Sequence, residues 1–192
     1  MTRLGQSPSA TVGPFFGVGL IREGMNVIVT DETRGERIRI EGRLLDGHDQ
    51  PVPDGMIEIW QANAQGRYNH ALDHRNLPLD PGFRGWGRAA TNATGTYWFE
   101  TIKPGRVPGL AGVLQAPHVN VIVFARGMPL HAFTRIYFDG EEGNASDPVL
   151  GRIAEPARRE TLIARRDPAS GRTTYRFDIR LQGSEETVFF DA

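Results

Sequence analysis

Residues 117–126 form the stretch whose residue types and spacing are most suggestive of chemistry. The sequence PHVNVIVFAR alternates as a β-strand does, so His118 and Asn120 point to the same face. The rise along a strand places them about 6–7 Å apart. Two histidines at that spacing would make half of a metal site. Because a neutral amide is a weak replacement for imidazole, the strand indicates a metal site in which one ligand is replaced.

The other histidines do not form a site by themselves. His70 and His74 have the i, i+4 spacing of two ligands on one helix face, but nearby prolines and glycines disfavour a helix. His48 falls in a turn, and His131 lies in or beside a hairpin. The sequence contains no cysteine, which excludes disulfides, thiol nucleophiles and zinc–thiolate sites.

Short alternating segments must position these side chains. The strand pattern occurs at residues 37–44, 56–60, 96–102, 117–126, 133–138, 161–164 and 174–181, with turn-forming residues between them. This organisation predicts an all-β protein, an antiparallel β-sandwich. One short helix is predicted to begin at Asp147-Pro148, where an N-cap carboxylate precedes proline, and to end before Pro156.

The chain is predicted to consist of an N-terminal arm and one domain. Glycines and prolines in residues 1–30 disfavour a helix, and Phe15-Phe16 is suited to docking on an apolar surface. Residues 31–192 are predicted to form the β-sandwich. Residues 69–91 are predicted to be a long loop, a feature that is usually functional or covers a partner.

Composition narrows the possible partners. The formal net charge of −1 gives no electrostatic reason to expect nucleic acid as a partner. No segment approaches the roughly 20 apolar residues that cross a bilayer, and no membrane association is expected. We therefore expect a cytoplasmic protein.

Several motifs together resemble the intradiol ring-cleavage dioxygenases, over nearly the whole chain from Thr11 to Asp191. The motifs are residues 59–68 (IWQANAQGRY), 77–81 (LPLDP), 83–87, 101–105 (TIKPG), 117–120 (PHVN), 158–164, 175–183 and 187–191. The resemblance implies a β-sandwich that holds a non-haem Fe(III) between two tyrosinates and two histidines. It also implies a catecholic substrate, which O2 cleaves between the two hydroxyl-bearing carbons to give a muconate.

The resemblance can be carried over to the four ligand positions of this chain. The first tyrosine falls on Tyr68 and the first histidine on His118, whereas the second tyrosine falls on Val107 and the second histidine on Asn120. Valine has no donor atom, and two protein ligands of four would not hold ferric iron firmly. The resemblance therefore implies an iron-free α subunit with vestigial ligand positions, no bound metal and no catalytic residue of its own.

Such a subunit is expected to act through a partner. The resemblance implies an α/β heteromer of higher order in which the β subunit binds Fe(III), and in which the α subunit lines part of the substrate pocket. The matching positions here are Thr11, Gly13, Pro14, Phe15 and Arg126. For Arg126, a salt bridge within the chain is an equally good interpretation, and for Gly13-Pro14 the alternative is a simple chain reversal.

Two other hypotheses remain open at this stage. One is a self-sufficient intradiol dioxygenase with an altered ligand set. The other is a non-catalytic, transthyretin-like β-sandwich binding module, a class that Asp46-Gly47, residues 51–53 and residues 57–59 also fit.

Overall fold

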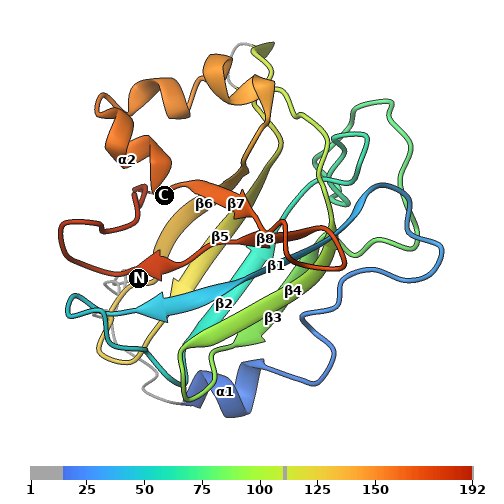
Figure 1. Ribbon diagram of the computed structural model, residues 1–192. Coiled ribbons are helices and arrows are strands. Elements are labelled where there is room, and N and C mark those ends of the chain that lie inside the picture. The colour runs from blue at the N-terminus through green and yellow to red at the C-terminus, as the bar shows by residue number, and fades with distance from the viewer. Residues whose placement is uncertain (1–14, 110–111, 192) are drawn as a thin grey trace, which may run out of the picture.

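Strands dominate the structure of the protein, a computed structural model that describes residues 15–109 and 112–191 (Figure 1). The strands are β1 (Arg37–Leu45), β2 (Met56–Trp60), β3 (Trp86–Ala90), β4 (Thr96–Ile102), β5 (His118–Phe124), β6 (Ala132–Phe138), β7 (Ile163–Arg166), β8 (Thr174–Arg176) and β9 (Ile179–Arg180). The helices are short: α1 (Phe15–Leu20), α2 (Pro156–Glu160) and the 3-10 helices η2 (Glu142–Ser146) and η3 (Leu150–Arg152). The predicted all-β class is confirmed.

The strands are hydrogen-bonded in the order β3-β2-β5-β6-β7-β8-β1-β4, and β9 also pairs with β1. The pairs β1–β8, β1–β9 and β6–β7 are parallel, whereas the other pairs are antiparallel as predicted, so the arrangement is mixed. The reason is visible at β6 and β7, which are joined by a long connection through η2, η3 and α2. A connection of that length can return the chain to the end of the sheet from which it started, as parallel pairing requires.

The two ends of this order, β3 and β4, lie close together, so the sheet nearly closes on itself. The segment before β1 bridges them. The backbone N–H of Arg88 on β3 donates to the carbonyl of Met25 (3.1 Å), and the N–H of Ile28 donates to the carbonyl of Glu100 on β4 (3.0 Å). Ile28 is buried in the core. The later part of the expected arm therefore packs on the strands of its own chain.

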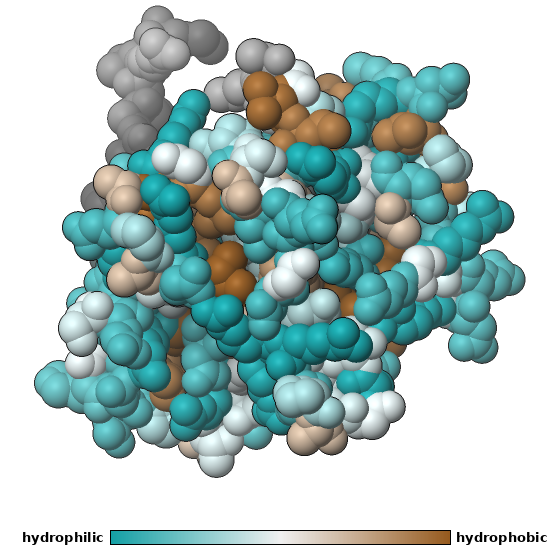
Figure 2. Space-filling model, turned by 45° about the horizontal axis from the view of Figure 1, so that its top comes forward, coloured by the Kyte–Doolittle hydropathy of each residue, from teal (hydrophilic) through white to brown (hydrophobic). Residues whose placement is uncertain are grey.

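The core lies on one face of the central strands. On β5, Val119, Val121 and Val123 are fully buried, as the alternation predicts, and His118 and Asn120 lie on the opposite face. The side chains of that second face, apart from the buried His118, are partly exposed to solvent. The surface in Figure 2 is mostly hydrophilic, with hydrophobic residues visible in separate patches.

The helices differ from the prediction of one short helix, because α1 and α2 are both present. Asp147 accepts backbone hydrogen bonds as an N-cap does, but only the 3-10 turn of η3 follows it. Pro156 begins α2 instead of ending a helix, since proline needs no N–H partner in a first turn. Neither α1 nor any other helix in the described ranges is long and apolar enough to span a bilayer.

Strand β3 lies within the predicted loop of residues 69–91. Its inward positions are Gly87 and Ala89, so it lacks the large apolar residues that would indicate a strand. Gly87 is required by packing, because a Cβ there would lie 2.4 Å from the Ile28 side chain and 2.5 Å from the Met25 carbonyl oxygen. Small residues thus allow the bridging segment to lie directly against β3.

Candidate functional site

The turn after β2 positions Tyr68. The buried side chain of Asn63 accepts hydrogen bonds from two backbone N–H groups of this turn (3.0 and 2.9 Å). The Asn63 carbonyl accepts another from the N–H of Gly105, in the segment after β4 (2.9 Å). Gly66 has a positive φ of 79°, and a Cβ there would meet the Arg106 carbonyl oxygen at 2.0 Å. Two segments distant in the sequence are therefore held in direct contact beside Tyr68.

The side chain of Tyr68 is neutral and hydrogen-bonded. Its ring stacks on Trp60, with centroids 6.0 Å apart and an interplanar angle of 13°. The amide nitrogen of Asn120 donates to the Tyr68 hydroxyl oxygen (3.3 Å). Burial raises the pKa of Tyr68 above its ordinary value, which keeps the phenol protonated at neutral pH.

His118 is buried and also neutral. Its Nδ1 lies 2.8 Å from the carbonyl oxygen of Ala116, so Nδ1 carries the proton and donates it. Burial lowers the pKa of His118 to about 4, with the positive charge of Arg135 as the next cause. The imidazole ring lies 5.6 Å from the ring of Tyr137, centroid to centroid.

Val107, at the position of the second tyrosine ligand, is buried and lines a hollow of about 840 Å³ together with Tyr68. Its backbone carbonyl accepts the N–H of Gln115 (2.8 Å), and its side chain offers no donor atom. Of the four positions, this one offers no donor atom and Asn120 offers only a neutral amide, so the donor set does not fit ferric iron.

The positively charged side chain of Arg135 lies beside these positions. Arg135 on β6 is directly opposite Asn120 on β5. Its Nη1 donates to the Gln115 side-chain oxygen (2.5 Å) and approaches the Tyr137 hydroxyl (3.4 Å). The charge of Arg135 lowers the pKa of His118, which means that it opposes a second positive charge there.

The sequence did not reveal Arg135, because its placement depends on the register between β5 and β6. A register shift of one residue would have put it on the other face of the sheet. The period-two pattern of residues 133–138 does place Arg135 on one face with Phe133 and Tyr137. Only the pairing of His118 with Tyr137 shows that this face is shared with the vestigial positions.

Arg126 lies beyond the opposite end of β5 from His118. More than half of its side chain is exposed, and its guanidinium pairs with Asp54 in the turn before β2 (2.7 Å). The salt bridge expected as the alternative interpretation is therefore present. Phe15 is the first residue of α1, whereas Thr11, Gly13 and Pro14 lie outside the described residues.

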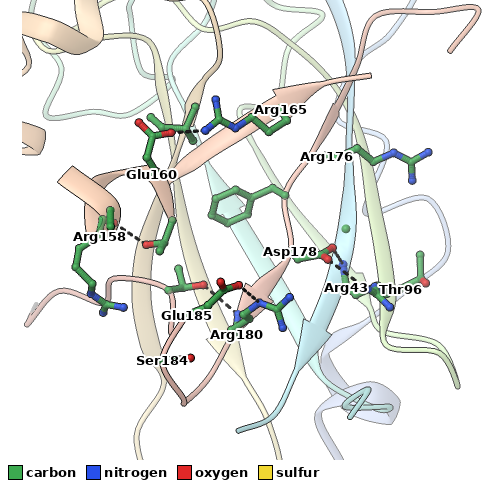
Figure 3. A pocket seen from close by; sticks show the side chains of 16 residues that line it. Arg43, Thr96, Arg158, Glu160, Arg165, Arg176, Asp178, Arg180, Ser184 and Glu185 are labelled. Carbon is green, nitrogen blue, oxygen red and sulfur yellow. Dashed lines mark hydrogen bonds and ion pairs between the residues drawn. The ribbon is translucent and has the colours of Figure 1, made fainter. Parts of the chain in front are cut away.

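A second hollow, of about 720 Å³, lies among α2, β8, β9 and the C-terminal segment (Figure 3). The arginines that line it are Arg43, Arg158, Arg165, Arg176 and Arg180. Each guanidinium has a carboxylate partner in this chain: Asp178 (3.3 Å), Glu186 (3.8 Å), Glu160, Asp167 (3.0 Å) and Glu185 (3.8 Å), respectively. Because each guanidinium already has a carboxylate partner, little positive charge is left for a ligand.

Known proteins resemble this chain along nearly its whole length. A family described as "Dioxygenase" matches residues 12–183. The chain is 44% identical to the protocatechuate 3,4-dioxygenase alpha chain of Pseudomonas putida, over 98% of this chain and 97% of that protein. It is 39% identical to the protocatechuate 3,4-dioxygenase beta chain of Burkholderia cepacia, over 84% and 71%. An intradiol ring-cleavage dioxygenase structure from Tetranychus urticae has a TM-score of 0.63 and 24% identity, over 94% of this chain and 98% of that one.

Proposed function

The chain belongs to the dioxygenase family, and we propose that it is the iron-free α subunit of a protocatechuate 3,4-dioxygenase. The family resemblance noted in the sequence is thereby confirmed. The proposed enzyme uses O2 to cleave protocatechuate between its two hydroxyl-bearing carbons, which gives 3-carboxy-cis,cis-muconate. The observation that carries the proposal is that an α chain matches almost every residue, while the four ligand positions hold only one tyrosine and one histidine.

Iron is proposed to lie in the partner subunit. Intradiol dioxygenases are iron-dependent, and a ferric ion is best served by ionised tyrosines and imidazoles. Here Val107 provides no donor, and Asn120 provides only a neutral amide, which already bonds Tyr68. We therefore assign Fe(III) to a β subunit in an α/β heteromer of higher order, and none to this chain.

This chain is proposed to line part of the substrate pocket of that β subunit. The positions that the family resemblance implies are Thr11, Gly13, Pro14, Phe15 and Arg126. Arg126 supports the idea physically, because more than half of its side chain is exposed and it is held by a surface pair with Asp54. An arginine so placed is suited to a carboxylated aromatic ring. The earlier part of the expected arm, which carries Thr11, Gly13, Pro14 and Phe15, would supply the other contacts by reaching the partner.

The strands are proposed to form the two layers of a β-sandwich, as the resemblance implies, with β3-β2-β5-β6 in one layer and β8-β1-β4 in the other. The alternative of a transthyretin-like binding module is set aside, because the family and the α chain both match nearly the whole sequence.

Co-expression tests the proposal. The chain purified without a partner should be colourless and inactive, and the α/β complex should show the burgundy absorption of tyrosinate-to-iron charge transfer and should cleave protocatechuate. Iron analysis of the complex should give one iron per α/β pair. Two irons per pair, or stoichiometric iron in the chain alone, would contradict the assignment of iron to β.

A further inference from the structure

Asp-Gly is a dipeptide at which a protein backbone can rearrange without an enzyme, and this chain contains Asp46-Gly47, Asp54-Gly55 and Asp139-Gly140. The glycine nitrogen attacks the aspartate Cγ, because glycine has no side chain to hinder the approach. An N–Cγ bond forms, and the N–H proton leaves with a protonated carboxyl oxygen as water, which gives a cyclic imide. A water molecule then opens the ring. Opening at the main-chain carbonyl leaves an isoaspartate, in which the backbone runs through Cγ.

The structure holds Asp54-Gly55 against this attack. The N–H of Gly55 donates to the Thr91 hydroxyl (2.7 Å), so the attacking nitrogen is already engaged. Gly55 is buried, and a Cβ on it would lie 2.6 Å from the Leu44 side chain. The Asp54 carboxylate is held by Arg126 (2.7 Å). Both reacting groups are therefore fixed by other contacts.

Asp46-Gly47 is held by its own turn. The Oδ1 atom of Asp46 accepts the backbone N–H groups of His48 (2.8 Å) and Gln50 (3.0 Å). These hydrogen bonds lower the pKa of Asp46 and keep the side chain as a carboxylate, whereas loss of water requires the protonated carboxyl. A Cβ on Gly47 would lie 3.0 Å from the Gln182 side chain, so this glycine is also packed against a neighbour.

Asp139-Gly140, directly after β6, lacks these constraints. Both residues are exposed, and a Cβ built on Gly140 would have no atom of another segment within 4 Å. In the described part of the chain, no acceptor is placed for the Gly140 N–H. The Asp139 carboxylate has a long ion pair with Arg165 (3.7 Å), which pairs more closely with Glu160. The nitrogen and the carboxyl group are therefore both accessible to each other.

The rearrangement would change a junction between neighbouring elements. The N–H of Asp139 donates to the Ala164 carbonyl on β7 (3.0 Å), and the Asn144 side chain in η2 donates to the Phe138 carbonyl (2.8 Å). An isoaspartate at residue 139 inserts a methylene group into the main chain just after the first of these bonds. The end of β6 and the start of η2 would then no longer fit the same two bonds.

We propose that Asp139-Gly140 is a site of spontaneous isoaspartate formation, and that it rearranges ahead of Asp46-Gly47 and Asp54-Gly55. The dipeptide is the same at all three places, so the order comes from the folded contacts around each nitrogen and each carboxyl group. The site is independent of the proposed function, because the reaction needs only this chain and water.

Incubation in oxygen-18 water near neutral pH tests the proposal, with the protein in the assembly in which it purifies. Each passage through the imide adds one oxygen-18 atom. Mass spectrometry of tryptic peptide 136–152 reports Asp139, and fragmentation of peptide 44–67 separates the other two sites. Asp147 does not interfere, because Pro148 has no N–H to form the imide. Label should enter at Asp139 at least about tenfold faster than at Asp54, where the glycine must first give up a hydrogen bond.

Two controls make the result specific. Asp139→Glu keeps the charge beside Arg165 but would have to close a larger ring, so label at residue 139 should disappear while the other two sites are unchanged. In urea, where the folded contacts are lost, the three sites should take up label at similar rates. No label at Asp139, faster label at Asp46 or Asp54, or the same order in urea as in the folded protein would overturn the proposal.

Discussion

The amide nitrogen of Asn120 lies 3.3 Å from the hydroxyl oxygen of Tyr68, so two vestigial ligand positions are hydrogen-bonded to each other. This bond joins strand β5 to the loop after β2 and satisfies a polar group in a partly buried place. The two side chains therefore satisfy each other in the metal-free chain.

The buried neutral His118 predicts a specific loss of stability in acid. Its pKa is about 4 in the folded protein and about 6.5 when unfolded, so the unfolded chain binds more protons between these values. Stability is full above pH 6.5 and falls as the pH drops toward 4. Between pH 7 and pH 5 the expected contribution is a loss of about 2 kcal/mol in the free energy of unfolding.

Urea denaturation at the two pH values measures this contribution. In His118→Asn, the difference between pH 7 and pH 5 should shrink by about 2 kcal/mol, even though the variant is less stable at both. The carboxylates of the protein contribute equally to the pH dependence of parent and variant, so their contribution cancels in the comparison. An unchanged pH difference would show that His118 is not the titrating group.

Asp147 is predicted to be a major structural carboxylate. It is buried, and its oxygens accept the N–H of Ala116 (2.7 Å), two N–H groups at the start of η3 (2.8 and 2.9 Å) and the Tyr137 hydroxyl (3.2 Å). Asp147→Ala leaves these donors unpaired and should cost about 3 kcal/mol in the free energy of unfolding. Asp139→Ala, at a half-exposed carboxylate, is the control and should cost less than about 1 kcal/mol by the same measurement.

The sequence predicts the strands of this fold better than the site between them. On β1, Ile38, Ile40 and Leu44 are buried and alternate with more exposed residues, so periodicity alone identifies the strand. The same method fails at β3, where Gly87 and Ala89 are the buried positions. Hydrophobic pattern reports a strand only when its inward side chains are large.

Hydrophobic periodicity does not show which residues lie opposite each other on neighbouring strands. The motifs place Tyr68, Val107, His118 and Asn120 near one another, and the structure joins Tyr68 with Asn120 and with Val107 around one hollow. The position of Arg135 opposite Asn120 depends on register, which the turn after β5 and tertiary packing determine.

Arg126 is predicted to act on substrate binding more than on stability. In the α/β enzyme, Arg126→Ala should raise KM for protocatechuate about tenfold, the usual loss for a hydrogen bond to a charged group, with kcat little changed. Asp54→Asn is the matched control, because it breaks the same ion pair and leaves the guanidinium in place. If both variants give the same steady-state kinetics, Arg126 serves only the salt bridge.

Restoring the missing ligands is predicted to fail while Arg135 remains. Val107→Tyr with Asn120→His supplies four protein ligands, but the guanidinium of Arg135 lies opposite residue 120, and its charge lowers the pKa of His118. A trivalent cation would enter against that charge. We expect the double variant to bind little iron, and the triple variant with Arg135→Met to bind substantially more.

Iron content and tyrosinate-to-iron absorption of the α/β complex measure this gain above the one iron per pair expected in β. Arg135→Met alone is the control and should add no iron, because removing the charge supplies no ligand. A similar gain in the double and triple variants would show that ligand identity alone excludes the metal. The expected order instead makes the charge of Arg135 a second barrier, independent of Val107 and Asn120.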